Sequence, residues 1–428
     1  MDFKHICVIG LGYIGLPTSS MFARNGVQVT GVDTNEQVVT SLQHGKVHIF
    51  EPGLNEVVKE VLENGTLQIS TTPVEADAFI IAVPTPFYGN KKADLSYVRS
   101  AAESILPVLR HGNLVVLEST SPPLTTRDVV KPILERSGMV AGRDFLLAYS
   151  PERVLPGQIM RELVENARVI GGIDEASALA GGDLYRIIVK GEIVLTDSTT
   201  SEMVKLMENT YRDVNIAIAN EFSRLADRFG VDIWEAVKIA NLHPRVRILN
   251  PGPGVGGHCI GVDPWFLVEA APDITPLIHT ARRVNDEQPG FVLETLKQLI
   301  PDLSGKRIAL LGLAYKPDVD DLRESPAIEI AHDLVKAGAI VKAYEPFRTT
   351  YPLPGAIMTT SLEETIKDAE AILLLVGHAQ FKSLDPVEIA RITPARLVLD
   401  TVNGWSREGW RAAGFTFERL GDRKHSIR

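Results

Sequence analysis

The chain has 428 residues, of which 45% are hydrophobic and 23% charged, and its formal net charge is −10. This length predicts two or three domains with full cores. The acidic balance argues against a nucleic-acid or anionic-membrane partner, because both need a basic face. The sequence has no apolar run long enough to span a membrane, and its two cysteines are too few for a disulfide framework, so we expect a cytoplasmic protein.

The first 150 residues alternate short apolar runs with amphipathic stretches. Residues 35–45 and 95–112 have the periodicity of helices. The apolar runs are rich in valine and isoleucine and predict strands at residues 5–10, 27–33, 76–86, 112–120 and 144–153. Strands that are apolar throughout and alternate with helices predict a parallel sheet covered on both faces.

A glycine-rich turn follows the first strand. Residues 10–15 form G-x-G-x-x-G between a strand and a helix, which is typical of a turn that cradles a dinucleotide pyrophosphate. Asp33 ends the second strand, where a carboxylate accepts from ribose hydroxyls and repels a 2′-phosphate, so we expect NAD rather than NADP. Thr85 and Thr120 end later strands, at the edge where such sheets bind ligands. The alternatives are a glycine-rich turn without a ligand and threonines that only cap helices.

The middle of the chain is helical. The helical pattern covers residues 199–230, 232–243 and 277–300. Lys205, Asn209 and Arg212 are spaced four and three apart, so they share one face of the first of these helices. Buried lysine and asparagine need partners and often mark function. The alternative is a solvated face on which Lys205 pairs with Glu202 or Glu208.

A second alternating unit begins at residue 304. Its strands are predicted at residues 306–317, 339–346, 369–377 and 395–403. Gly312 stands at the turn after the first of them, without a G-x-G-x-x-G motif, and Tyr315, Lys316 and Arg323 follow. This set suits a different anionic ligand, such as a nucleotide diphosphate. The polar tail at residues 419–428 is expected to be frayed.

The segment NPGPGVGGHCIGVDPWF, residues 250–266, surrounds one of the two cysteines with glycine and proline. Small residues let a substrate approach the Cys259 sulfur, and a nearby cation such as Lys205 would favour the nucleophilic thiolate. One alternative is an inert cysteine in a structural turn. Another is a metal pair with His258, which the adjacency of the two residues and the lack of a second cysteine nearby disfavour.

NAD together with a nucleophilic cysteine narrows the chemistry. A single hydride transfer needs only a general base. A thiol becomes useful when an aldehyde is oxidised further, because its thiohemiacetal can lose a second hydride and become a thioester that water cleaves. With a second nucleotide-like domain, these features predict oxidation of a nucleotide-linked alcohol to an acid. A two-electron dehydrogenase of the hydroxyacid type, which would leave the cysteine idle, and a non-catalytic NAD-sensing scaffold are the alternatives.

Six segments along the whole chain resemble the UDP-glucose/GDP-mannose dehydrogenase family. They read GLGYIGLP, VPTPF, YSPERVLPG, EMVKLMENTYRDVN, HPRVRILNPGPGVGGHCIGVDPWF and AYKPDVDDLRESPA. Members that act on UDP-glucose typically have Phe and Lys in the cysteine motif, where this chain has Ile260 and Val262. The resemblance therefore implies a UDP-sugar other than UDP-glucose.

The resemblance implies an α/β fold in three parts. They are an N-terminal NAD-binding Rossmann domain at residues 1–198, a central helical dimerisation segment with the cysteine loop at 199–303, and a C-terminal Rossmann-like, UDP-sugar-binding domain at 304–428. The implied protein is a cytoplasmic homodimer with NAD as cofactor and without a metal. Its activity would be the four-electron oxidation of the C6 alcohol of an N-acetylated UDP-hexosamine, with N-acetylmannosamine as the first choice of sugar, N-acetylglucosamine as the second, and surface polysaccharide as the destination.

The resemblance also implies roles for individual residues. Cys259 would form the thioester, Lys205 would act as general acid and base, and Asp263 would assist the water or orient the cysteine. The residues implied to contact the UDP-sugar are Arg153, Val154, Lys205, Asn209, Arg212, His243, Arg245, Gly256, Tyr315 and Lys316, of which His243 and Arg245 can come from the partner subunit of a dimer. The residues predicted to contact the cofactor are Gly10, Gly12, Tyr13, Ile14, Gly15, Asp33, Thr85, Thr120 and Arg323. Glu152 is a further candidate for positioning a water.

Overall fold

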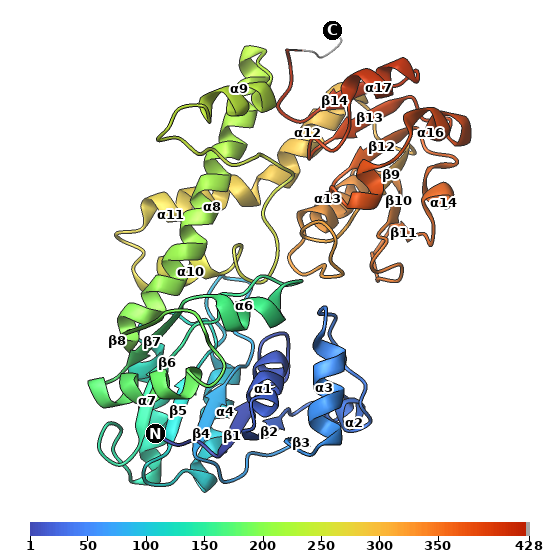
Figure 1. Cartoon of the computed structure of the whole chain (residues 1–428). Helices are drawn as coiled ribbons and strands as arrows, with labels where there is room; N and C mark the ends of the chain where they lie inside the picture. The colour runs from blue at the N-terminus through green and yellow to red at the C-terminus, as the bar shows by residue number, and fades with distance from the viewer. Residues whose placement is uncertain (425–428) are drawn as a thin grey trace. The chain divides into compact units, whose positions relative to one another are not determined.

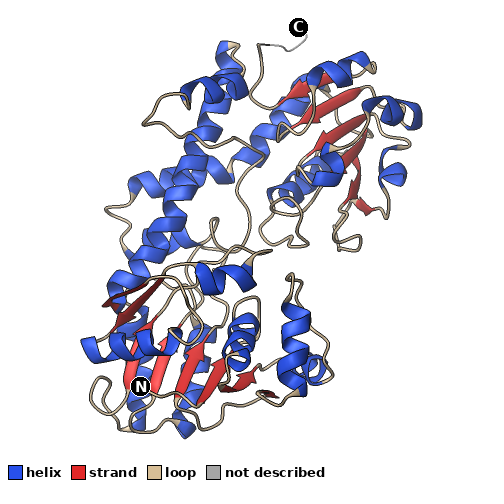
Figure 2. Ribbon diagram, viewed as in Figure 1, coloured by secondary structure: helices blue, strands red, loops and turns tan. Residues whose placement is uncertain are grey.

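The computed structural model describes residues 1–424, which form two compact units. The first unit comprises Met1–Glu208 and Trp265–Pro272, and the second comprises Asn209–Pro264 and the chain from Asp273 onward. Figure 1 labels the helices and strands of both units. Each unit contains one sheet with helices packed against it (Figure 2).

The first unit contains an eight-stranded sheet with the order β3-β2-β1-β4-β5-β6-β7-β8. Its strands are β1 (His5–Ile9), β2 (Gln28–Val32), β3 (Leu67–Ser70), β4 (Ala78–Ile81), β5 (Leu114–Leu117), β6 (Leu146–Tyr149), β7 (Arg168–Gly172) and β8 (Ile193–Asp197). Its helices are α1 (Gly15–Arg24), α2 (Glu36–Gln43), α3 (Leu54–Glu63), α4 (Ser96–Ile105), η1 (Leu106–Val108), η2 (Thr126–Val130), α5 (Lys131–Leu134), η3 (Glu135–Ser137), α6 (Ile159–Glu165) and α7 (Glu175–Tyr185). The first six strands are parallel, whereas β7 pairs antiparallel with β6 and β8 runs parallel to β7.

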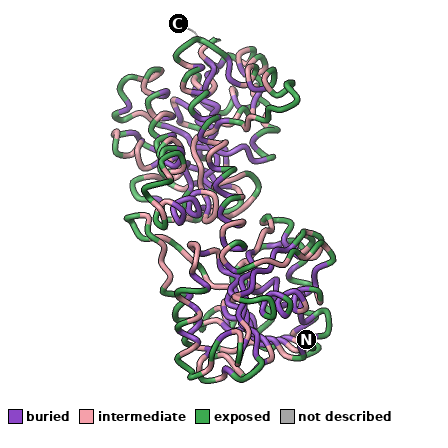
Figure 3. The backbone as a smooth tube through the Cα atoms, turned by 90° about the vertical axis from the view of Figure 1, so that its left-hand side faces the viewer, coloured by how far each residue is buried: buried purple, intermediate pink, exposed green. Residues whose placement is uncertain are grey.

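The six inner strands of this sheet are mostly buried because both of its faces are covered. Successive side chains of a strand point to opposite faces. In β1, Ile6 packs in the same apolar cluster as Phe22 of α1, and Cys7 packs in the cluster that holds Val98 of α4. The buried strands form the purple centre of the unit in Figure 3. Burial raises the pKa of the Cys7 thiol to about 11, so Cys7 is an inert core residue.

The second unit repeats the strand order of the first six strands. Its sheet is parallel throughout, in the order β11-β10-β9-β12-β13-β14. The strands are β9 (Arg307–Leu311), β10 (Ile340–Tyr344), β11 (Ile357–Met358), β12 (Ala371–Leu374), β13 (Leu397–Asp400) and β14 (Thr416–Arg419). The helices around it are α13 (Pro326–Lys336), α14 (Leu362–Ile366), α15 (Ala379–Lys382), α16 (Pro386–Ile392) and α17 (Arg407–Ala412). The two sheets are therefore structural counterparts in strand order.

The central helices are α8 (Ser198–Phe229), α9 (Ile233–Ala240), α10 (Asp263–Ala270), α11 (Pro276–Asp286) and α12 (Gln288–Leu299). The prediction of a helical middle is confirmed. The segment predicted as helical from residue 277 to residue 300 is two helices, and Pro289 lies in the first turn of the second one. Proline is tolerated there because the first amides of a helix have no intrahelical partner.

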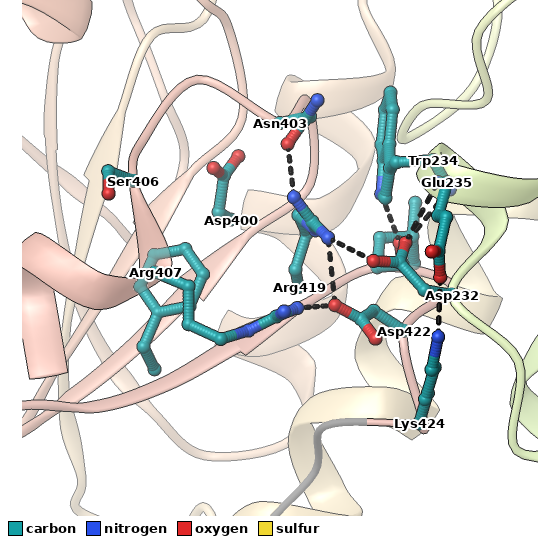
Figure 4. A network of polar contacts seen from close by, with 12 residues as sticks. Asp232, Trp234, Glu235, Asp400, Asn403, Ser406, Arg407, Arg419, Asp422 and Lys424 are labelled. Carbon is teal, nitrogen blue, oxygen red and sulfur yellow. Dashed lines mark hydrogen bonds and ion pairs between the residues drawn. The ribbon is translucent and has the colours of Figure 1, made fainter. Parts of the chain in front are cut away.

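The end of the described chain is bound to α9, which corrects the prediction of a frayed tail for residues 419–424. Figure 4 shows these contacts. Arg419 donates to Asp232 at 2.8 Å and to Asp422 at 2.9 Å, and the Trp234 indole donates to the Leu420 carbonyl at 2.9 Å. Asp422 is 1% exposed. Residues 425–428, the rest of that prediction, lie outside the described residues.

Five strands were not predicted: β3, β7, β8, β11 and β14. Most of them lie at or next to a sheet edge, where part of each strand faces solvent and the apolar run is short. In β7, which is fully buried, an arginine begins the strand and two glycines end it. An antiparallel pair on a parallel sheet was also not expected.

Candidate active site

The glycine-rich turn after β1 has the geometry of a dinucleotide cradle. Gly10 has φ +96°, a conformation that residues with a side chain rarely adopt. A Cβ at Gly15 would lie 1.8 Å from the Gly10 carbonyl oxygen, so only glycine allows α1 to start so close to the turn. Gly12 is exposed, and nothing lies within 4 Å of its Cβ position. A phosphate can therefore approach this backbone closely. Tyr13 and Ile14, both half-buried, complete the turn.

Asp33 lies beside this turn, as predicted. Its Oδ2 accepts from the Leu11 amide at 3.0 Å, and its Oδ1 accepts from the Asn35 amide at 2.9 Å. These two bonds fix the carboxylate at the end of β2, next to the glycine turn, where the ribose of a dinucleotide binds in folds of this kind. The residues present therefore fit NAD.

Thr85 and Thr120 come together at the carboxyl edge of the same sheet. Thr85 follows β4, Thr120 follows β5, and the Thr85 hydroxyl donates to the Thr120 carbonyl at 2.5 Å. Neighbouring parallel strands end at the same edge, which is where open α/β sheets bind ligands. The two threonines therefore join two loops at the edge where NAD fits.

The second sheet has a similar turn, but the acid beside it is fully buried, whereas Asp33 is half-buried. Glu345 follows β10 as Asp33 follows β2, and its carboxylate accepts from the amides of Leu313 and Ala314 at 2.8 and 2.9 Å. His378 lies 3.0 Å from the same oxygen, and both side chains are fully buried. Because Glu345 is buried and hydrogen-bonded inside the protein, its carboxylate does not face a ligand. The second turn is therefore not arranged to bind a ribose as the first one is.

The polar face of α8 is buried in part. Lys205 and Asn209 are each 8% exposed, one turn apart, whereas Arg212 is exposed. The glutamates that could neutralise Lys205 have other partners. Glu202 accepts from the Leu124 and Thr126 amides and the Thr126 hydroxyl, and Glu208 pairs with Arg153. The alternative of a solvated face is wrong for Lys205 and Asn209.

The loop that carries Cys259 is fixed from both of its sides. Cys259 is half-exposed, and four residues later Asp263 begins α10 with a 2% exposed carboxylate. The Asn209 amide donates to Asp263 at 2.5 Å, so the helix stripe and the cysteine loop are in direct contact. On the other side, the Gly257 amide donates to the Arg323 carbonyl at 3.0 Å.

The cysteine loop packs against the turn that follows β9. A Cβ at Gly256 would lie 2.4 Å from the Glu324 carbonyl oxygen, and a Cβ at Gly257 would lie 2.7 Å from the Tyr315 ring. Lys316 lies over the same ring, with its ammonium 5.7 Å from the centroid. Three residues predicted to contact the UDP-sugar, Gly256, Tyr315 and Lys316, thus lie together where the loop meets this turn.

His258, next to the cysteine, was considered from the sequence only as a metal ligand. Its Nδ1 lies 3.0 Å from Arg323 Nη2 and 3.7 Å from Asp321 Oδ2. Burial favours the neutral ring, but hydrogen bonds with Asp321 and Cys259 outweigh it and raise the pKa of His258 to about 9. A positively charged imidazole is a common neighbour of nucleophilic cysteines in proteins. Asp321 had no role in the sequence predictions, because its link to His258 depends on the fold.

Amide side chains hold the start of the loop, and sequence reasoning missed them. The Gly252 amide donates to Asn220 of α8 at 3.0 Å, and its carbonyl accepts from Gln288 of α12 at 3.1 Å. Asn220 also donates to Asn285 of α11 at 2.9 Å. No local sequence signal separates them from the other polar residues of these helices, because α8, α11 and α12 all contain many polar residues.

The remaining predicted substrate residues lie elsewhere. Arg153 donates to Glu208 and to the Ala167 carbonyl, and Val154 is half-buried beside it. His243 and Arg245 are exposed in the segment after α9. No contact links these last two residues to the cysteine loop within residues 1–424, so their predicted role stays a prediction.

Three family models match consecutive parts of the chain. They describe the NAD binding domain, the central domain and the UDP binding domain of the UDP-glucose/GDP-mannose dehydrogenase family, at residues 4–189, 199–287 and 309–407. The chain belongs to this family. The family resemblance predicted from sequence motifs is confirmed, as are an NAD-dependent nucleotide-sugar dehydrogenase activity and NAD as the cofactor. The UDP binding domain supports a UDP-sugar as the substrate.

Relatives match over nearly their whole length. The UDP-N-acetyl-D-mannosamine dehydrogenase of Methanocaldococcus jannaschii is 47% identical over 429 residues, covering 99% of this chain and 98% of that protein. The NDP-N-acetyl-D-galactosaminuronic acid dehydrogenase of Ralstonia nicotianae is 47% identical over 417 residues, with 95% and 97% covered. The structure of UDP-D-ManNAc dehydrogenase from Pyrococcus horikoshii has a TM-score of 0.91 at 42% identity, with 98% of this chain and 100% of that chain covered. Within residues 1–424, no helix is long and apolar enough to cross a membrane.

Proposed function

We propose that this protein oxidises the C6 alcohol of UDP-N-acetyl-D-mannosamine to a carboxylate and forms UDP-N-acetyl-D-mannosaminuronate. Relatives with this named activity match almost the full chain. The observation that carries the chemistry is the cysteine loop, in which a half-exposed Cys259 is fixed between the buried Asn209–Asp263 bond and the turn after β9. An inert structural cysteine needs neither exposure nor this support.

The residues of the chain divide the reaction between them. Lys205 takes the proton of the C6 hydroxyl and stabilises oxyanions at C6. The Cys259 thiolate adds to the aldehyde, and its thiohemiacetal is oxidised to a thioester. Asp263 orients the cysteine or assists the water that cleaves the thioester. NAD, when bound, accepts the hydride in each of the two oxidations, so each sugar consumes two NAD and one water.

The substrate contacts are part of the same proposal. Arg153, Val154, Asn209, Arg212, Gly256, Tyr315 and Lys316 bind the UDP-sugar, and Arg323 reaches the cofactor. His243 and Arg245 are exposed, which suits residues donated across the interface of a homodimer. We also propose the division into an NAD-binding domain at residues 1–198, a central segment at 199–303 and a UDP-sugar-binding domain at 304–428. A reactive thiol needs a reducing compartment, so we propose the cytoplasm.

The sugar is the finest part of the proposal. Ile260 and Val262 depart from the motif of UDP-glucose enzymes, which supports an N-acetylated hexosamine. A relative named for an N-acetylgalactosaminuronic acid product is as similar to this chain as those named for N-acetylmannosamine. The choice of sugar therefore depends on contacts between the protein and the hexose ring. N-acetylglucosamine and N-acetylgalactosamine are the competing sugars.

The test is NADH formation with limiting UDP-N-acetylmannosamine, UDP-N-acetylglucosamine, UDP-N-acetylgalactosamine and UDP-glucose, each supplied alone. Two NADH per sugar with the first would support both the chemistry and the sugar. Two NADH per sugar with only one of the other UDP-sugars would keep the mechanism and assign that sugar as the substrate. One NADH per sugar would refute the thioester mechanism. Cys259→Ser should abolish net acid formation, whereas a two-electron dehydrogenase would keep nearly full turnover.

A further inference from the structure

A buried acid and a buried imidazole lie together at the ligand edge of the second sheet. Glu345 directly follows β10, and His378 lies four residues after the end of β12. These two strands flank β9 and run parallel to it, so the loops that follow the three strands meet at one edge. Both side chains are fully buried. Burial of two ionisable groups is costly without partners, so the groups that they bind indicate what they do.

Glu345 holds the start of the turn that follows β9. One of its carboxylate oxygens accepts from the amides of Leu313 and Ala314, which directly precede Tyr315. Burial raises the pKa of Glu345, but the hydrogen bonds from His378 and from these two amides outweigh it and hold the pKa below its ordinary value. Glu345 is therefore a buried carboxylate that is bound to the backbone of this turn.

His378 holds the end of the same turn. Its Nε2 lies 3.0 Å from the Glu345 carboxylate, and its Nδ1 accepts from the Asp318 amide at 2.9 Å. Because Nδ1 accepts from an amide, the contacts assign the ring proton to Nε2, which donates to Glu345. The Asp318 carboxylate lies farther from Nδ1, at 3.7 Å, and accepts from the Ala379 amide at 2.9 Å. The imidazole thus links the two ends of the turn.

The turn between these two anchors has little freedom. Gly312 has φ +90°, and a Cβ there would lie 2.5 Å from the Val376 Cβ in the loop after β12. Asp318 has φ +60°, a conformation that residues with a side chain rarely adopt. Tyr315 and Lys316, the half-buried residues predicted to contact the UDP-sugar, lie between these two positions. The buried pair therefore fixes both ends of the segment that carries them.

We propose that Glu345 and His378 are positioning residues that set the affinity for the uridine diphosphate part of the substrate by holding Tyr315 and Lys316 in place. This proposal rests on the proposed function, in which those two residues bind the UDP-sugar. The first sheet leaves its acid, Asp33, half-buried beside the cofactor turn, whereas the second sheet uses its acid to fix a turn. The pair acts on the binding of UDP and UDP-sugars and leaves NAD binding unchanged. The alternative is a pair that only stabilises the fold.

The first test is the Kd of UDP, measured by titration calorimetry on the full chain. His378→Leu is similar in size and removes both hydrogen bonds of the ring, so UDP should bind about 10-fold more weakly, because fewer molecules hold the turn in its binding conformation. The KM of the UDP-sugar should rise by a similar factor, whereas kcat and the Kd of NAD should change by less than about threefold. His378→Gln keeps a donor and an acceptor and should restore most of the affinity. An unchanged Kd of UDP in His378→Leu, or an equal loss of affinity for UDP and NAD, would overturn the proposal.

Thr393→Val is the matched control for a loss of buried hydrogen bonds. Thr393 is buried between α16 and β13, at the opposite edge of the same sheet. Its hydroxyl donates to the Ile366 carbonyl at 2.5 Å and accepts from the Ala395 amide at 3.1 Å. Valine has nearly the same shape, so this variant should have a lower Tm and an unchanged Kd of UDP. If it weakened UDP binding as much as His378→Leu does, general destabilisation would explain both results and the proposal would be wrong.

Asp318→Ala tests the same anchor if His378→Leu does not fold. The Asp318 side chain is exposed, so its loss is compatible with folding. Alanine disfavours the left-handed backbone and cannot accept from the Ala379 amide, so UDP should bind about 10-fold more weakly. Asp318→Asn keeps an acceptor and tolerates this backbone, so its Kd of UDP should equal that of wild type. Equal Kd values for the two variants would contradict the proposal.

Wild type measured in parallel separates this proposal from the proposed function. Two NADH per sugar in wild type, together with a Kd of UDP that none of the substitutions at His378 and Asp318 changes, would leave the proposed function standing and overturn the positioning role. A wild-type protein that does not bind UDP would overturn both.

Discussion

The cysteine loop offers a quantitative test at Gly257. This residue has φ +83°, and a Cβ there would lie 2.7 and 2.8 Å from two atoms of the Tyr315 ring. Gly257→Ala would combine a left-handed backbone strain of about 1–2 kcal/mol with overpacking of about 1–3 kcal/mol. The sum, about 2–5 kcal/mol, corresponds to a Tm lower by about 5 to 15 °C.

Gly252→Ala is the matched control in the same loop. Nothing lies within 4 Å of its Cβ position, and its backbone is not in the left-handed region. We expect its Tm to stay within a few degrees of that of wild type. Thermal unfolding and kcat should be measured on both variants, and kcat of Gly257→Ala should fall by about 100-fold because the cysteine is displaced. Equal effects of the two substitutions would refute the close packing of this loop.

Three other predictions concern separate parts of the site. Gly15→Ala should abolish NAD binding in a fluorescence titration, because its Cβ would overlap a carbonyl oxygen. Asn209→Ala should lower Tm and kcat, because the buried Asp263 carboxylate loses the hydrogen bond from Asn209, at a cost of about 1–3 kcal/mol. The pKa of His258 is raised to about 9, so its contribution to stability is complete below pH 6.5 and is lost as the pH rises through about 9. In His258→Gln, the thermal unfolding midpoint should therefore depend less on pH over that range than it does in wild type.

Much of the site could be predicted because its signals are local. The glycines of residues 10–15, the acid at Asp33 and the segment around Cys259 each lie within one strand–turn–helix unit or one loop. The spacing of the glycines indicates the backbone conformation, since a left-handed turn or a close approach of a ligand to the backbone needs glycine wherever the rest of the chain lies. The family motifs are local in the same sense.

The contacts that give these residues their surroundings could not be predicted. The Asn209–Asp263 bond, the link from His258 to Asp321 and the hydrogen bonds from Arg168 to Ser150 and Glu152 join residues from different elements. The direction of β7 decides on which edge its arginine lies, and that direction depends on pairing with β6, not on the sequence of β7 alone.

By itself the sequence determined the cofactor turn, the glycine-rich loop around Cys259 and the alternation of strands and helices, because each depends on neighbouring residues. Only the tertiary structure decided which polar groups are buried and what they bind. Lys205 shows the difference, since its spacing on a helix allowed either a solvated or a buried side chain. In the folded protein the side chain is buried. The neighbouring glutamates Glu202 and Glu208 do not hold it at the surface, because each is bound to a partner on another element.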